Sequence, residues 1–178
     1  MYVGDGKGKT TAAMGAAARA LGHGWSVFVL QFMKEEKWPS GERDFFRNIT
    51  PLLLGEGKGE VTIETAGEGF VGIMGDQKER ETHKAAAQAG YKKALATLVS
   101  KKYQLVILDE ILSAVDEGLL TEREILDLIT KKPEDVTLVM TGHKSYPAIF
   151  AKADLVTEMK KIKHPFDSGY IAKKGIDF

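Results

Sequence analysis

Short apolar runs alternate with longer amphipathic segments along most of this chain. This alternation is typical of a three-layer α/β fold, in which a mostly parallel β-sheet carries helices on both faces. The apolar runs predict strands over residues 1–3, 26–32, 61–64, 104–108, 136–141 and 155–159. The amphipathic segments predict helices over residues 10–21, 41–53, 76–100, 121–130 and 146–152.

Two of the predicted strands, residues 26–32 and 104–108, are nearly continuous apolar runs, as expected for strands buried on both faces. No internal repeat or low-complexity linker divides the chain, so we expect one domain over residues 1–178. The last stretch, residues 160–178, contains Pro and Gly and has no clear period. We expect it to be an irregular tail that wraps the core.

The start of the chain has the composition of a phosphate-binding loop. It consists of Gly4, Asp5, Gly6, Lys7, Gly8, Lys9, Thr10 and Thr11. Glycines let backbone N–H groups turn towards a polyphosphate. Lys9 supplies a positive charge for the phosphates, and the Thr10 hydroxyl can bind Mg²⁺. The Ala-rich segment that follows is a strong helix former, so the N-terminus of a helix faces the anion.

The match to the P-loop pattern G-x-x-x-x-G-K-[ST] is incomplete, because Val3 stands at the first glycine position and Gly4 follows one residue later. The alternative interpretation is a flexible Gly/Lys-rich segment that binds nothing. The order Gly8-Lys9-Thr10, followed at once by a helix, favours phosphate binding and therefore a P-loop NTPase-like (RecA-like) fold.

A second signature lies where the apolar run 104–108 ends in Asp109 and Glu110. In P-loop proteins a carboxylate at such a strand end holds Mg²⁺ directly or through water. The other interpretation is a pair of ordinary acids at a helix N-terminus. Ligands of open α/β sheets bind at the carboxyl ends of strands, and residues 4–11, Asp109, Glu110 and 141–143 all fall at such ends.

Several further residues have two interpretations, one as part of a ligand site and one as ordinary structure. Residues 141–143 form either a ligand-contacting loop or a plain turn. Arg19 either reaches back towards the phosphates or is a solvated surface arginine. The glycine-rich segment 67–72 either brings Phe70 against a flat ligand or is a loop anchored by one buried ring. His164 is either a metal ligand or acid/base group, or a structural histidine.

The composition narrows the function classes. The 178 residues carry 25 basic and 25 acidic side chains and a formal net charge of zero, so neither nucleic acid nor an anionic membrane is an expected partner. The absence of cysteine excludes disulfides, thiolate catalysis and zinc–thiolate sites. No apolar run of about 18 residues and no signal-peptide pattern is present, so we expect a cytoplasmic protein.

Taken together, the motifs resemble the ATP:corrinoid adenosyltransferases of the BtuR/CobA type over nearly the whole chain. Besides residues 4–13, the resemblance rests on the segments 18–24, 31–34, 69–70, 108–111, 118–120, 141–142, 153–159, 163–166 and 175–178 and on Gly169.

The resemblance implies a P-loop fold, a homodimer, and transfer of the 5′-deoxyadenosyl group of ATP to Co(I) of a corrinoid such as cobalamin or cobinamide, with triphosphate as the leaving product. It implies that residues 4–11 hold the triphosphate, that Thr10 and Glu110, with Asp109, bind Mg²⁺, and that Arg19 assists the phosphates. Phe70 would lie against the corrin. No catalytic side chain is expected, because Co(I) is itself the nucleophile. An electron donor such as a flavoprotein is an expected partner, since the cobalt must be reduced.

The sequence departs from the family pattern at three places. Only three residues precede Gly4, so we expect either a very short first strand or further residues upstream of Met1. Val71-Gly72 stands where the family has Thr-Trp after Gly-Phe, at the corrinoid-binding position, and His143 stands where it has a phosphate-contacting arginine. Two other functions are therefore weighed beside the transferase: a different P-loop ATPase or kinase, in which Glu110 orients water, and a non-catalytic module that binds ATP or a corrinoid.

Overall fold

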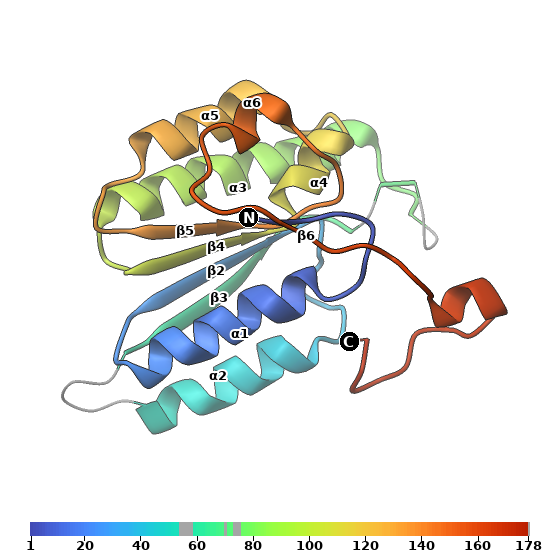
Figure 1. The fold of residues 1–178 in the computed structure, drawn as a ribbon, viewed down its shortest axis with the longest axis horizontal. Helices are drawn as coiled ribbons and strands as arrows, with labels where there is room; N and C mark the ends of the chain where they lie inside the picture. Colours follow the sequence, from blue (N-terminus) through green and yellow to red (C-terminus); the bar gives the residue numbers. More distant parts are fainter. Residues whose placement is uncertain (54–58, 70, 73–75, 178) are drawn as a thin grey trace.

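The paired strands of the protein run parallel and are joined by helices (Figure 1). A computed structural model describes residues 1–53, 59–69, 71–72 and 76–177. In it, β2 (Val27–Phe32) pairs with both β3 (Val61–Ala66) and β4 (Leu105–Asp109), and β4 also pairs with β5 (Thr137–Met140). This gives a four-stranded sheet of order β3-β2-β4-β5.

A second pair of strands continues this sheet beyond β5. β1 (Tyr2–Val3) pairs in parallel with β6 (Thr157–Glu158), and Tyr2 forms a parallel bridge with Thr141 just past the end of β5. The N–H of Gly142 donates to the carbonyl of Tyr2 (3.3 Å). The carboxyl ends of β1, β4 and β5 therefore meet at one edge of the sheet.

Helices cover both faces of the sheet, as the alternation of the sequence predicts (Figure 1). One face carries α1 (Lys9–Gly22) and α2 (Gly41–Leu53). The other carries α3 (Arg80–Ser100), α4 (Ile111–Asp116), α5 (Glu122–Lys131) and α6 (Pro147–Phe150). The three-layer α/β prediction is confirmed. None of the helices within the described residues has the length and apolar character needed to cross a bilayer.

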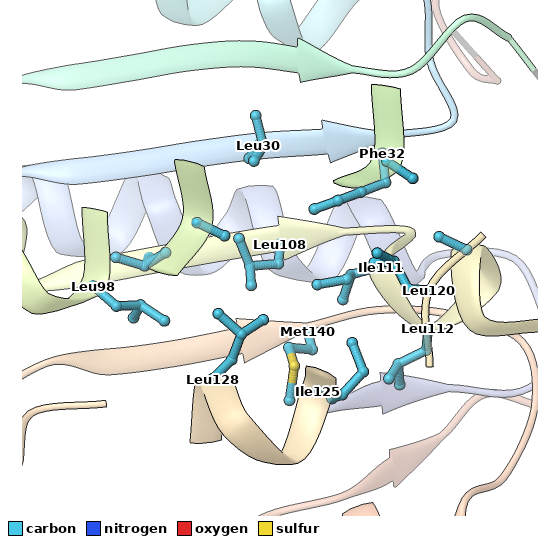
Figure 2. Packing of buried hydrophobic residues seen from close by; sticks show 14 of the residues in the cluster. Leu30, Phe32, Leu98, Leu108, Ile111, Leu112, Leu120, Ile125, Leu128 and Met140 are labelled. Atoms are coloured by element: carbon cyan, nitrogen blue, oxygen red, sulfur yellow. The ribbon is translucent and has the colours of Figure 1, made fainter. Parts of the chain in front are cut away.

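The central strands are buried on both faces because their alternate side chains join two separate cores. Val27 and Val29 of β2 pack with the α1 and α2 side, whereas Phe28, Leu30 and Phe32 pack with the other side. Figure 2 shows Leu30, Phe32 and Leu108 of the strands facing side chains from α3, α4 and α5. The nearly continuous apolar run in β2 follows from this two-sided burial.

All the strands and helices predicted from the sequence are present, with shifted ends. The largest shift is in α3, which begins at Arg80 rather than at residue 76. Asp76 instead closes a turn ahead of the helix, because its carboxylate accepts from the backbone N–H of Gly72 (2.9 Å) and of Lys78 (3.1 Å). The sequence pattern cannot separate such a turn from the first turn of a helix.

Two expectations about irregular regions are corrected. The six-residue helix α4 is absent from the prediction, which assigns no element between residues 108 and 121. Glu110, whose φ is 60°, separates this helix from β4. The tail does not wrap the core. Among its residues from 160 to 177 whose exposure is described, all are exposed except half-buried His164, and they include one short 3-10 turn, η1 (Pro165–Ser168).

Candidate functional site

The glycine-rich loop lies between β1 and α1 in a conformation that needs its glycines. Gly4 and Gly8 have φ angles of 106° and 110°, a left-handed region that side chains rarely adopt. A Cβ at Gly6 would lie 2.6 Å from the carbonyl oxygen of Met159. The loop is fixed from both sides, because Gly4 N–H donates to His143 O (3.1 Å) and Gly6 N–H donates to Met159 O (2.7 Å).

Lys9 occupies the inside of this loop. Its side chain is buried with 7% of its surface exposed, and Nζ donates to the carbonyls of Gly4 (2.8 Å) and Gly6 (2.9 Å). Its ammonium group therefore lies inside the loop, next to the N-terminus of α1. Such an arrangement of charge, turned backbone and helix dipole attracts a polyphosphate.

Asp109, at the carboxyl end of β4, is the centre of the polar network beside the loop. It is fully buried, and both of its oxygens accept hydrogen bonds. Oδ1 accepts from the hydroxyls of Thr10 (2.9 Å) and Thr141 (2.8 Å). Oδ2 accepts from Gln31 Nε2 (3.1 Å) and Lys34 Nζ (3.0 Å). The network therefore ties together the ends of β2, β4 and β5 and the start of α1.

Glu110 follows in a left-handed conformation that turns its side chain away from the strand direction. Its N–H donates to Thr141 Oγ1 (2.8 Å), and its Oε2 accepts from Ser113 Oγ (2.5 Å). A non-glycine residue in this conformation carries a backbone cost that the surrounding hydrogen bonds must offset. Buried Thr141 thus connects Asp109 with Glu110, so this threonine belongs to the site network rather than to a plain turn.

Lys9, Thr10 and Glu110 line a pocket of about 400 Å³ at the carboxyl edge of the sheet. Its lining combines phosphate-loop residues, residues that follow β2 and β4, and the end of the tail: Lys7, Gly8, Lys9, Thr10, Thr11, Met14, Lys34, Gly41, Glu42, Glu110, Gly175, Ile176 and Asp177. Lys7 forms an ion pair with Asp177. The tail therefore forms one wall of the pocket.

The donor set fits Mg²⁺. Thr10, Asp109 and Glu110 offer a hydroxyl and two carboxylates, and hard oxygen ligands are what this cation prefers. Among the described residues no group of three or more His, Asp or Glu side chains gathers to hold a metal by itself.

Three predicted phosphate contacts lie elsewhere. Arg19 is exposed in the last turn of α1, roughly 12 Å along the helix axis from Thr11, so the structure does not bring it to the pocket. The side chain of His143 is exposed, and only its carbonyl contacts the loop. Asp5 accepts from the N–H of Lys161 (3.0 Å), which lowers the pKa of its carboxyl group below the ordinary value.

The expected corrinoid-binding segment is only partly described, because Phe70 lies outside the described residues. Val71 packs against the core on the α3 side. Gly72 has a φ of 69° and open space where a Cβ would project. The departure from the family's tryptophan therefore coincides with a backbone conformation that a tryptophan would adopt only with strain.

Polar contacts anchor this segment to its neighbours. Lys78 Nζ donates to Glu68 Oε2 (2.6 Å) and to Glu35 Oε1 (2.8 Å), which joins it to the segment after β2. A Cβ at Gly69 would lie 3.3 Å from Trp38 Cζ2, so an indole ring lies directly beside the glycine-rich turn.

Sequence reasoning assigned no role to Gln31, Lys34 and Glu42, although Gln31 and Lys34 contact Asp109 and Lys34 and Glu42 line the pocket. The signal for the first two is their position directly at the end of β2. The strand-end argument that found Asp109 applies equally to them. Gln31 Oε1 is buried without a hydrogen-bond partner among the described residues, so an acceptor is left for a water or ligand donor.

A phosphate-type loop at the carboxyl edge of a parallel sheet places the protein among the P-loop α/β proteins. Within that class, the chain belongs to one family: the sequence model described as ATP:corrinoid adenosyltransferase BtuR/CobO/CobP matches residues 1–178.

Relatives from several bacteria agree with this assignment. The chain is 36% identical to the corrinoid adenosyltransferase of Escherichia coli K12 over 178 residues, which cover all of this chain and 84% of that protein. It is 37% identical over 178 residues to the corrinoid adenosyltransferase of Pseudomonas aeruginosa, covering 82% of it, and 34% identical over 177 residues to that of a Sinorhizobium species, covering 77% of it.

Proposed function

We propose that this protein, as one domain over residues 1–178, transfers the 5′-deoxyadenosyl group of ATP to Co(I) of a corrinoid in adenosylcobalamin synthesis. The observation that carries the proposal is the match of the whole chain to the adenosyltransferase family. The pocket supports it, because Lys9, Thr10 and Glu110 converge there at the carboxyl edge of the sheet.

The reaction forms one bond and breaks one. The electron pair of Co(I) forms the cobalt–C5′ bond, the C5′–O bond of ATP breaks, and its electron pair leaves with the triphosphate. Because Co(I) is a strong nucleophile, the protein needs no nucleophilic side chain. Its task is to hold C5′ in line with cobalt, and such positioning contributes about 7–11 kcal/mol in well-oriented reactions.

The second task is to stabilise the negative charge that grows on the triphosphate. Lys9 and the loop N–H groups other than those of Gly4 and Gly6, which bond to His143 and Met159, would do this. Thr10, Glu110 and Asp109 are the residues that would hold Mg²⁺, and the bound cation would neutralise part of the same charge. On binding, Lys9 Nζ would exchange the carbonyls of Gly4 and Gly6 for phosphate oxygens.

The corrinoid would lie against the segment that includes Phe70, Val71 and Gly72. Since Gly72 carries no ring, Trp38, which lies beside Gly69, would offer an aromatic surface to the corrinoid. A homodimer, an electron donor such as a flavoprotein and a cytoplasmic location also belong to the proposal. Light scattering on the purified protein tests the dimer.

Anaerobic spectrophotometry tests the transfer itself. Purified protein, Mg²⁺ and ATP are added to chemically reduced cobalamin, and the Co(I) absorbance is followed. We expect it to disappear with the appearance of a light-sensitive alkylcorrinoid, at a rate that requires ATP. ATP consumption with unchanged Co(I) would instead indicate a P-loop hydrolase or kinase, and binding without either reaction would indicate a delivery module.

A further inference from the structure

Lys34 is a cationic residue of the pocket that also contacts the buried carboxylate of Asp109. It follows β2 directly, lines the pocket, and has a side chain that is 19% exposed. Its Nζ lies 3.0 Å from Asp109 Oδ2 and 4.0 Å from Glu42 Oε1. Among the described residues it is the ammonium group bound to the buried carboxylate at the centre of the site network.

This contact has an electrostatic reason. Asp109 is fully buried, and a buried carboxylate without a compensating charge is strongly destabilising. Lys34 supplies that charge. Gln31, Thr10 and Thr141, the other donors to Asp109, are neutral.

A divalent cation at Thr10, Asp109 and Glu110 would change this balance. It would supply positive charge at the same carboxylate and repel the ammonium of Lys34. A triphosphate bound by Lys9 would at the same time place several negative charges in the pocket that Lys34 lines. Both effects draw Lys34 Nζ from Asp109 towards the phosphates.

We propose that Lys34 is an exchangeable counter-ion. Its ammonium group pairs with Asp109 in the absence of nucleotide and pairs with the triphosphate when the magnesium nucleotide binds. The inference rests on the proposed function, because it takes ATP as the ligand of the pocket. Lys34 should therefore have two opposite effects. It lowers the affinity for a free divalent cation and raises the affinity for the cation–nucleotide complex.

Because the two affinities should change in opposite directions, a single substitution tests the proposal. Lys34→Met removes the charge and keeps the length of the side chain. We measure Mn²⁺ affinity without nucleotide by electron paramagnetic resonance and MgATP affinity by calorimetry. We expect the variant to bind Mn²⁺ about tenfold more tightly and MgATP about tenfold more weakly than the wild type, which corresponds to about 1.4 kcal/mol in each direction.

Controls separate this role from a structural one. Lys37→Met alters a neighbouring lysine that pairs with Glu35 and is 73% exposed, and both affinities should stay at the wild-type values. Lys34→Arg keeps the charge and should stay close to the wild type. If Lys34→Met does not fold, Lys34→Gln, which keeps a hydrogen-bond donor for Asp109, replaces it.

Weaker binding of both ligands, or no change in Mn²⁺ affinity, would overturn the exchange. Failure of the proposed function gives a different result, because a wild type that does not bind MgATP would already fail the nucleotide titration. The Mn²⁺ measurement contains no nucleotide and does not depend on that outcome.

Discussion

Single side chains at the carboxyl edge of the sheet decide what this pocket can bind. Lys9 and Thr10 are recognisable from the sequence, because the spacing of a phosphate loop requires them. Asp109 is recognisable as an acid at a strand end, but its burial and its four donors are not, since they come from three other segments. Arg19 shows the opposite limit: its spacing already places it about 12 Å along the helix axis from Thr11, and only the family resemblance assigned it to the phosphates.

Lys9→Ala tests the phosphate loop. The change removes the ammonium that bonds to the carbonyls of Gly4 and Gly6 and that would bind the triphosphate. Hydrogen bonds to charged groups contribute about 1.5–3 kcal/mol, so we expect ATP affinity to fall by about 10- to 100-fold in calorimetry. Lys131→Ala, in an exposed i,i+4 pair on α5, is the control. Equal affinities of Lys9→Ala and wild type would contradict the loop assignment.

At the scale of elements, the sequence pattern predicts the sheet and its covering helices because two-sided burial leaves a nearly continuous apolar run in β2 and β4. It does not predict where short elements begin. The start of α3 and the whole of α4 depend on local hydrogen bonds of Asp76 and on the backbone of Glu110, which leave no periodic signal. The sequence pattern also does not show where a helix lies very close to the sheet, as α3 does at Gly90.

Gly90→Ala in α3 tests this packing. A Cβ at Gly90 would lie 2.6 Å from Ala66 Cβ and 2.8 Å from Phe32 Cε1. Overpacking costs about 1–3 kcal/mol, which exceeds the gain in helix propensity of at most about 1 kcal/mol. We expect a lower Tm in thermal unfolding. The matched change Gly15→Ala on α1 meets nothing within 4 Å and should raise Tm; a rise in both variants would refute the close packing.

The turn before α3 gives a pH prediction. The N–H groups of Gly72 and Lys78, with the His83 ring 3.0 Å away, hold the pKa of Asp76 below its ordinary 3.8. Because the folded-state pKa is lower than the unfolded one, Asp76 stabilises the fold above pH 3.8 and loses this effect as the pH falls through its folded-state pKa. Asp76→Asn should therefore unfold at lower temperature than wild type at pH 7, and the difference should shrink below pH 3.8. A difference independent of pH would contradict this account.

At the scale of the whole molecule, the tail contacts the pocket rather than the core. The sequence-based expectation that it wraps the core was wrong, because even its large apolar side chains, among them Ile162 and Ile171, are exposed. Two polar contacts join it to the phosphate loop: Lys161 N–H donates to Asp5, and Asp177 pairs with Lys7. These contacts lie on the phosphate loop, so the state of the pocket and the position of the tail should be linked.

Limited proteolysis tests that link. The triphosphate would bring negative charge to Lys7 and repel Asp177, which should release the end of the tail. We expect MgATP to speed tryptic cleavage after Lys173 and Lys174 severalfold, as measured by mass spectrometry. Cleavage after Lys163, which is remote from the ion pair in the sequence, serves as the internal reference. Equal or slower cleavage at the two terminal sites would show that nucleotide does not displace Asp177.

The most direct test of the account identifies the phosphorus product of the complete anaerobic reaction with Mg²⁺, ATP and Co(I) corrinoid. Phosphorus NMR distinguishes cleavage at C5′–O, which releases intact triphosphate, from cleavage within the phosphate chain. We expect one triphosphate for each adenosylated corrinoid. ADP and orthophosphate, with Co(I) unchanged, would contradict it.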